Sequence, residues 1–185
     1  EIRNNGPESH LAKRGTPTMG GVIIILSTLL PTLLFSDLSN IMVLIIALST
    51  LWMGVIGFID DYLKIIIKAK DGMIARYKMI GQILLGVIIS YAIINSNDFN
   101  GFNTKTTIPF FKNFEFDFGI FYPLLVIVVI TATSNAVNLT DGLDGLAIGP
   151  IMITTLSFAF IAYFTGNLIY SEYLKIPYVN DTGEL

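Results

Sequence analysis

The sequence has no cysteine, one histidine and few charged residues, and each shortage excludes a class of protein. Without cysteine there is no disulfide framework, no thiolate metal site and no cysteine nucleophile. Charged residues make up 14% of the 185 residues, whereas a soluble domain carries about 25%. No basic arm is interleaved with aromatic residues, so we expect no nucleic-acid partner.

Apolar residues are abundant, at 53% of the chain, and the mean hydropathy is +0.69. Long apolar runs approach or exceed the roughly 20 residues that cross the hydrocarbon of a bilayer. We therefore predict an all-α integral membrane protein, a polytopic helical bundle that forms a single transmembrane domain over residues 1–185. Five spans are expected, at about 19–35, 41–59, 79–94, 120–137 and 146–164.

The positive charges fall mainly on one side of this predicted bundle. Five spans place the polar segments 1–18, 60–78 and 138–145 on one side and the segments 36–40, 95–119 and 165–185 on the other. Eight Lys and Arg residues then lie on the first side and three on the second. The first set is Arg3, Lys13, Arg14, Lys64, Lys68, Lys70, Arg76 and Lys78, and the second is Lys105, Lys112 and Lys175. Because positive charge is enriched in cytoplasmic loops, the first side is predicted to be cytoplasmic.

Residues 99–118 have a different pattern, which predicts a small external β-hairpin. Apolar and acidic residues alternate from Phe114 to Phe118, as in a half-exposed strand. Ile108 to Phe111 is its expected partner, with Lys112 and Asn113 in the turn.

Three polar segments on the predicted cytoplasmic side carry the candidate chemistry. The first, residues 13–21, joins Lys13 and Arg14 to a run rich in glycine with Pro17. Glycine lets the backbone approach a ligand, and free N–H groups at a helix start favour anions. The alternative is an ordinary basic flank with a helix cap.

The second segment places Asp60 and Asp61 together at the end of the second span. Two adjacent carboxylates repel each other, and at a helix C-terminus they oppose the helix dipole. A hard cation such as Mg²⁺ would stabilise the two carboxylates by neutralising their charge. Alternatively the helix continues, and Asp60 and Lys64 form an i,i+4 ion pair worth a few tenths of a kcal/mol.

The third segment repeats a polar side chain at every third position, at Asn135, Asn138, Asp141 and Asp144. In a helix these residues would share one face. Gly142 and Gly145 favour a ligand-lined break instead of a continuous helix. The alternative is a capped loop, with Asp141 or Asp144 as the N-cap of the fifth span.

Four carboxylates, several cations and glycine-rich turns on one side are suited to binding a polyphosphate together with a metal ion, as phosphoryl transfer requires. Lys78 and Arg76, at the start of the third span, would add a further phosphate clamp. Their alternative role is ordinary positive flanking charge.

These segments resemble signature sequences of the phospho-N-acetylmuramoyl-pentapeptide transferases. That family is a branch of the polyprenyl-phosphate N-acetylhexosamine 1-phosphate transferases. The resemblance rests on residues 13–21, on Gly57 to Tyr62 and on Asn135 to Ala147, in the family's order and spacing. It implies that undecaprenyl phosphate attacks the β-phosphate of UDP-MurNAc-pentapeptide with Mg²⁺ to give lipid I and UMP. It also implies a bacterial cell membrane protein with a cytoplasmic active site and leaves a homodimer open. The sequence leaves open a covalent phospho-enzyme on an aspartate, and we favour direct attack in a single step because the lipid phosphate is already an anion.

The resemblance also assigns roles to individual residues. Asp60, Asp61 and Asp141 would be the catalytic carboxylates and the candidate metal ligands, with Asp60 preferred for the lipid phosphate. The substrate-binding set would be Lys13, Thr18, Lys78, Asn135, Asn138, Gly142, Leu143 and Asp144.

The family has ten transmembrane helices, and these five spans would be its second to sixth. The chain begins without methionine and is interpreted as an internal fragment. The family's further metal-binding aspartate and histidine cluster are missing here, and His10 does not replace them. The 185 residues alone are therefore expected not to catalyse.

Three other interpretations stay open. A related enzyme would transfer GlcNAc-1-phosphate from UDP-GlcNAc to a polyprenyl phosphate. A transporter or ion pathway would explain acids in a membrane protein, although transporter sites lie near the midplane and these acids lie at span ends. A non-catalytic membrane scaffold predicts that alanine at Asp60, Asp61 and Asp141 changes nothing but stability.

Overall fold

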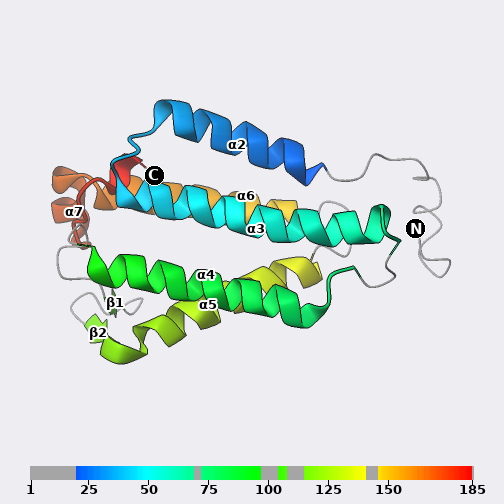
Figure 1. Cartoon of the computed structure of the whole chain (residues 1–185). Coiled ribbons are helices and arrows are strands. Elements are labelled where there is room, and N and C mark those ends of the chain that lie inside the picture. Colours follow the sequence, from blue (N-terminus) through cyan, green and yellow to red (C-terminus); the bar gives the residue numbers. More distant parts are fainter. Residues whose placement is uncertain (1–19, 69–71, 97–103, 108–114, 141–145, 185) are drawn as a thin grey trace.

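The structure, a computed structural model, describes residues 20–68, 72–96, 104–107, 115–140 and 146–184, and most of these residues are helical (Figure 1). The longer helices are α2 (Gly21–Phe35), α3 (Ile41–Ile65), α4 (Ala75–Asn95), α5 (Tyr122–Thr140) and α6 (Ile148–Thr165). The remaining elements are α7 (Leu168–Leu174), the strands β1 (Lys105–Thr107) and β2 (Glu115–Asp117), and the 3₁₀ turns η1 (Gly119–Phe121) and η2 (Thr182–Glu184).

The predicted helical membrane fold is confirmed. In the described part of the chain, four helices are long and apolar enough to cross a membrane: α3, α4, α5 extended by η1, and α6. The fifth predicted span corresponds to α6, and the first corresponds to α2, which is apolar but only 15 residues long. Large apolar side chains stand exposed on the helices, such as Leu34 on α2 and Phe158 on α6. These outward faces suit contact with lipid hydrocarbon and would be unfavourable in contact with water.

Two helices are longer than the hydropathy pattern predicted. The second span was expected to end at residue 59, but α3 continues to Ile65. The third span was expected over residues 79–94, but α4 begins at Ala75 and includes Arg76 and Lys78. In both cases charged residues extend the helix beyond the apolar run that defines the span.

The helices pack through small residues, as is usual in membranes. α3 packs against both α2 and α4, and α4 packs against α5. A Cβ added at Gly54 on α3 would lie 2.5 Å from Ile25 of α2. One added at Gly86 on α4 would lie 2.8 Å from the Ile127 side chain and 3.0 Å from its Cα on α5. These glycines therefore set how closely neighbouring helices approach.

The candidate site residues gather at one end of the bundle because the helices alternate in direction. Figure 1 shows the start of α2, the end of α3, the start of α4, the end of α5 and the start of α6 at that end. The opposite end carries the strands, α7 and the C-terminal residues. There the amide of Asn40 donates to the carbonyl of Asp181 at 2.8 Å, which ties the C-terminal segment to the start of α3.

The predicted hairpin exists, but its pairing differs from the expected one. β2 pairs antiparallel with β1 in the register Thr106↔Phe116. The expected partner, residues 108–111, lies outside the described residues together with the expected turn. The pairing leaves residues 108–114 between the strands, so the connection is longer than the two-residue turn that the sequence suggested.

Candidate functional site

The second polar segment lies on a continuous helix, so the helical alternative for Asp60 is confirmed. The Lys64 ammonium lies 2.7 Å from Oδ2 of Asp60, as an i,i+4 ion pair within α3. This cation near the end of α3 offsets the unfavourable placement of carboxylates there.

Asp60 also connects α3 to α4. The Lys78 ammonium lies 2.9 Å from the same Oδ2, and the Met73 N–H donates to Oδ1 at 2.8 Å. Gly72 adopts a φ of 66°, and a Cβ there would lie 2.5 Å from Oδ1 of Asp60. The Asp60 residue is 7% exposed and its carboxylate is surrounded by donors. It therefore fixes the α3–α4 connection and holds Lys78 in place.

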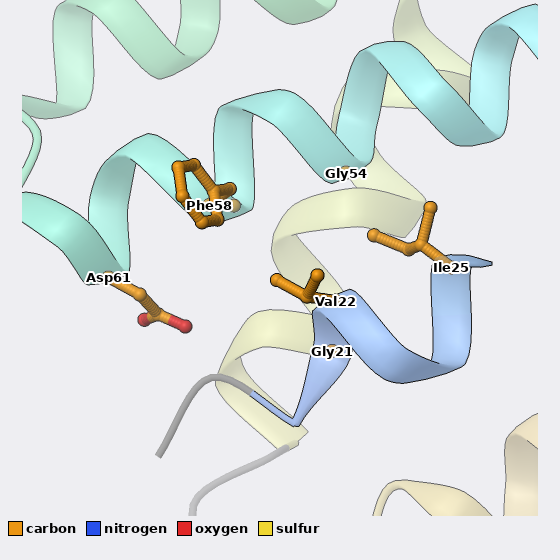
Figure 2. Close-up of a pocket in the computed structure, with 7 residues that line it drawn as sticks. Gly21, Val22, Ile25, Gly54, Phe58 and Asp61 are labelled. Atoms are coloured by element: carbon orange, nitrogen blue, oxygen red, sulfur yellow. The ribbon is translucent and has the colours of Figure 1, made fainter.

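Asp61 points to a different neighbour, because successive helical residues are rotated by about 100°. It lies at a cavity of about 150 Å³ between α2 and α3. Figure 2 shows its carboxylate extending from α3 toward the side on which α2 begins. The cavity is lined by Gly21, Val22, Ile25, Gly54, Gly57, Phe58 and Asp61. None of the described residues forms an ion pair or a side-chain hydrogen bond with Asp61, so of the two adjacent acids it is the one that these residues leave available.

A polar cluster that sequence reasoning missed joins α4 to α5. Gln82 is 4% exposed. Its Nε2 donates to Oγ of Ser134 at 3.0 Å, and its Oε1 accepts from Nδ2 of Asn135 at 3.1 Å. A signal was available, because Gln82 is an amide inside an apolar span, one helical turn after Lys78. Asn135, a predicted substrate ligand, is thus held by its neighbours.

The other candidates are only partly described. Asn138 is exposed near the end of α5, three residues after Asn135. Six candidates lie outside the described residues: Lys13, Thr18, Asp141, Gly142, Leu143 and Asp144. The N-cap of α6 is Ala147, without a side-chain cap. The hypothesis that Asp141 or Asp144 caps this helix is therefore wrong.

A divalent cation needs oxygen ligands, and the described acids differ in how well their carboxylates could supply them. Asp61 fits, because its carboxylate is exposed beside a cavity. Asp60 fits less well, because two ammonium groups and one N–H already surround it. Within residues 20–68, 72–96, 104–107, 115–140 and 146–184, no group of three or more His, Asp or Glu side chains is arranged to hold a metal ion. The third proposed ligand, Asp141, is not among them.

One end of the bundle thus presents three polar groups. They are the carboxylate of Asp61, the ammonium of Lys78 held by Asp60, and the amide of Asn135 on α5 held by Gln82 of α4. This combination suits an anionic ligand with further polar groups. The protein is a polytopic helical membrane protein with a polar site at one end of its helices.

Comparison with known proteins identifies the family. Residues 43–176 match the model of glycosyl transferase family 4, and residues 13–25 match the phospho-N-acetylmuramoyl-pentapeptide-transferase signature 1. The chain belongs to glycosyl transferase family 4.

Several curated relatives are similar along the whole chain. Phospho-N-acetylmuramoyl-pentapeptide-transferases from Chlorobaculum parvum and Chlorobaculum tepidum are each 46% identical over 184 residues. The corresponding protein from Desulforapulum autotrophicum is 48% identical over 184 residues. Each match covers 100% of this chain and 50% of the relative. The chain therefore spans about half the length of the curated relatives it matches.

Proposed function

We propose that the protein transfers phospho-MurNAc-pentapeptide from UDP-MurNAc-pentapeptide to undecaprenyl phosphate, giving lipid I and UMP. The observation that carries this proposal is the 46% identity to phospho-N-acetylmuramoyl-pentapeptide-transferases along the whole chain. The match of residues 13–25 to a signature named for that enzyme favours it over the GlcNAc-transferring alternative. The polar end of the bundle is compatible with the anionic substrates.

The reaction is a displacement at phosphorus. A phosphate oxygen of the lipid forms a bond to the β-phosphorus of the nucleotide sugar, and the bond from that phosphorus to the UMP oxygen breaks. The lipid phosphate is already an anion near neutral pH, so the attack needs little help from a base. Positioning and charge neutralisation are the main requirements.

The described residues divide these tasks in our proposal. Lys78, held by Asp60 at 2.9 Å, binds phosphate oxygen. Asp61, beside the cavity between α2 and α3, binds the ligand directly or through a metal ion. Asp60 acts chiefly by fixing Lys78, because its oxygens are already occupied. Asn135 and Asn138 bind the nucleotide sugar, with Lys13, Thr18, Asp141, Gly142, Leu143 and Asp144 as further proposed contacts.

Mg²⁺ is the proposed cofactor, with Asp61 and Asp141 as its proposed ligands. When bound, it would neutralise charge on the diphosphate. The proposed setting is the bacterial inner membrane, with the end that holds Asp60 and Lys78 on the cytoplasmic side. Four Lys and Arg residues of the described chain lie at that end, and two lie at the other. They are Lys64, Lys68, Arg76 and Lys78 at the first end and Lys105 and Lys175 at the second.

The test is a transfer assay on the natural full-length protein in detergent, with UDP-MurNAc-pentapeptide, undecaprenyl phosphate and Mg²⁺. Wild type is expected to form lipid I, and Asp61→Asn is expected to lose about 10²-fold or more of the rate, as is typical for a group that acts at the reacting centre. Ser90→Ala is the control, because Ser90 is buried on α4 and its hydroxyl donates to the Gly86 carbonyl of the same helix. A folded wild type that forms lipid-linked GlcNAc-1-phosphate from UDP-GlcNAc and no lipid I would contradict the proposal.

A further inference from the structure

The amide of Asn135 has a fixed orientation. Its Nδ2 donates to the backbone carbonyl of Thr131 at 2.7 Å and to Oε1 of Gln82 at 3.1 Å. A backbone carbonyl can only accept, so the nitrogen of this amide must be the atom that faces Thr131. Both hydrogens of the amide are then used, and Oδ1 is the acceptor that remains. None of the described residues donates to it.

Gln82 completes this arrangement from α4. Because its Oε1 accepts from Asn135, its Nε2 is the end that donates to Ser134, at 3.0 Å. Gln82 is 4% exposed, whereas Asn135 is exposed. A buried amide with both ends bonded has a single favourable orientation, because turning it over would set donor against donor. The two amides thus support each other's orientation, and Gln82 accepts from the second N–H of Asn135.

We propose that Gln82 is a positioning residue that makes Asn135 a hydrogen-bond acceptor for the nucleotide sugar. This inference rests on the proposed function and adds a specificity element to it. A carbonyl oxygen repels phosphate oxygen and binds an O–H or N–H group. The partner of Asn135 is therefore a donor of the uridine or of the sugar-peptide part, and the phosphates are left to the cations.

The position of Gln82 on α4 supports this division of roles. Lys78 lies one helical turn earlier and contacts α3 through Asp60. Gln82 contacts α5 through Ser134 and Asn135. A single turn of α4 therefore carries Lys78, a cation suited to phosphate, and Gln82, which orients the Asn135 acceptor on α5.

The test measures the dissociation constant of UDP-MurNAc-pentapeptide, by calorimetry on the natural full-length protein in detergent. Gln82→Met keeps the length of the side chain and removes its hydrogen bonds. We expect about fivefold weaker binding, which corresponds to about 1 kcal/mol. Ser90→Ala is the control for a buried polar change on the same helix and is expected to bind as wild type does. Ser134→Ala releases Gln82 with a smaller change of volume and is expected to weaken binding in the same direction.

A double-mutant cycle separates positioning from packing. Asn135→Leu is expected to weaken binding, and adding Gln82→Met to it is expected to change the constant less than twofold. Gln82→Glu retains an acceptor for Nδ2 and is expected to bind more tightly than Gln82→Met. If Gln82 has a purely structural role, Gln82→Met lowers the melting temperature and leaves the dissociation constant unchanged, which would overturn the inference. Additive effects of Gln82→Met and Asn135→Leu on the dissociation constant would overturn it too.

Binding of UMP distinguishes the two sources of the donor. If the donor belongs to the uridine, Gln82→Met weakens UMP binding as much as binding of the whole substrate. If it belongs to the sugar-peptide part, only the whole substrate is affected. A changed Mg²⁺ requirement with unchanged affinity for both ligands would overturn the assignment of Asn135. A folded wild type that binds neither ligand would overturn the proposed function and this inference together, whereas equal binding by wild type and Gln82→Met overturns the inference alone.

Discussion

At the scale of single residues, the adjacent acids Asp60 and Asp61 differ in what surrounds them. The Asp60 carboxylate accepts from Lys64, Lys78 and the Met73 N–H. The Asp61 carboxylate lies at a cavity. A helix rotates by about 100° per residue, so neighbours in sequence reach different helices. One acid therefore serves the fold and the other is available to a ligand.

This difference predicts that replacing the two acids affects stability unequally. Asp60→Asn is expected to lower the free energy of unfolding by about 2 kcal/mol, because a charged hydrogen-bond acceptor between two ammonium groups is lost. Asp61→Asn is expected to leave the melting temperature within the error of measurement. Both melting temperatures are measured in the same detergent. Equal losses for the two variants would show that Asp61 has a structural role that its exposed position does not reveal.

Sequence reasoning identified these residues but did not choose between their environments. It left open a bound cation or an ion pair at Asp60, and the ion pair with Lys64 is present. It did not find Gln82, because a glutamine in an apolar run shows no periodicity of its own. The role of Gln82 depends on which α5 residue lies opposite it, and that residue is known only from the packing of α4 on α5.

At the scale of elements, glycine determines how closely α4 approaches α5. A Cβ at Gly86 would lie 3.0 Å from the Cα of Ile127, and a backbone atom cannot move aside cheaply. Gly149 on α6 has nothing within 4 Å of such a Cβ.

Alanine at these two helical glycines is therefore expected to act in opposite directions. Gly86→Ala should destabilise the protein by about 1–3 kcal/mol through overpacking. Gly149→Ala should stabilise it by up to about 1 kcal/mol through helix propensity. Thermal unfolding in detergent checks both changes. Stabilisation by Gly86→Ala would mean that α4 and α5 separate more easily than their contact suggests.

The hairpin shows which part of an element a sequence can predict. The alternation of residues 114–118 correctly indicated a strand, and β2 covers Glu115–Asp117. The partner was misplaced because residues 108–111 are more apolar than Lys105–Thr107. Specific polar pairs accompany the observed register: Lys105 lies 3.2 Å from Glu115, and the Thr104 hydroxyl donates to Asp117 at 2.6 Å. Such pairs become visible only once the loop length is known.

Asp117 also gives the hairpin a predictable dependence on pH. The hydroxyl of Thr104 and then the N–H of Gly119 hold the pKa of Asp117 below its usual value of 3.8. A lowered pKa in the folded state means that these bonds stabilise the hairpin above pH 3.8 and are lost as the pH falls through the lowered pKa. The amide proton of Gly119 is expected to titrate with a midpoint below 3.8. Thr104→Val should raise that midpoint, and an unchanged midpoint would contradict the assigned cause.

At the scale of the whole molecule, the alternating helices separate two chemically different ends. The elements that meet at the end with Asp60 and Lys78 are seen in Figure 1, and that end carries most of the Lys and Arg residues of the described chain, whereas the end with the hairpin and α7 carries few. The same asymmetry was visible in the sequence, because span order alone assigns each polar segment to a side. The exact helix ends were not needed for this prediction.

The separation predicts how the protein lies in the membrane, and thiol labelling tests it, because these 185 residues contain no cysteine. Ile74→Cys places a thiol beside the start of α4, and Glu172→Cys places one on α7 at the opposite end; both positions are exposed. A membrane-impermeant maleimide added to intact spheroplasts is expected to label Glu172→Cys and to leave Ile74→Cys unlabelled. Both should react after the membrane is permeabilised, which controls for accessibility of each thiol. Labelling of Ile74→Cys alone in intact spheroplasts would place the candidate site outside the cell. A cytoplasmic nucleotide sugar could not then reach it, and the proposed function would fail with the orientation.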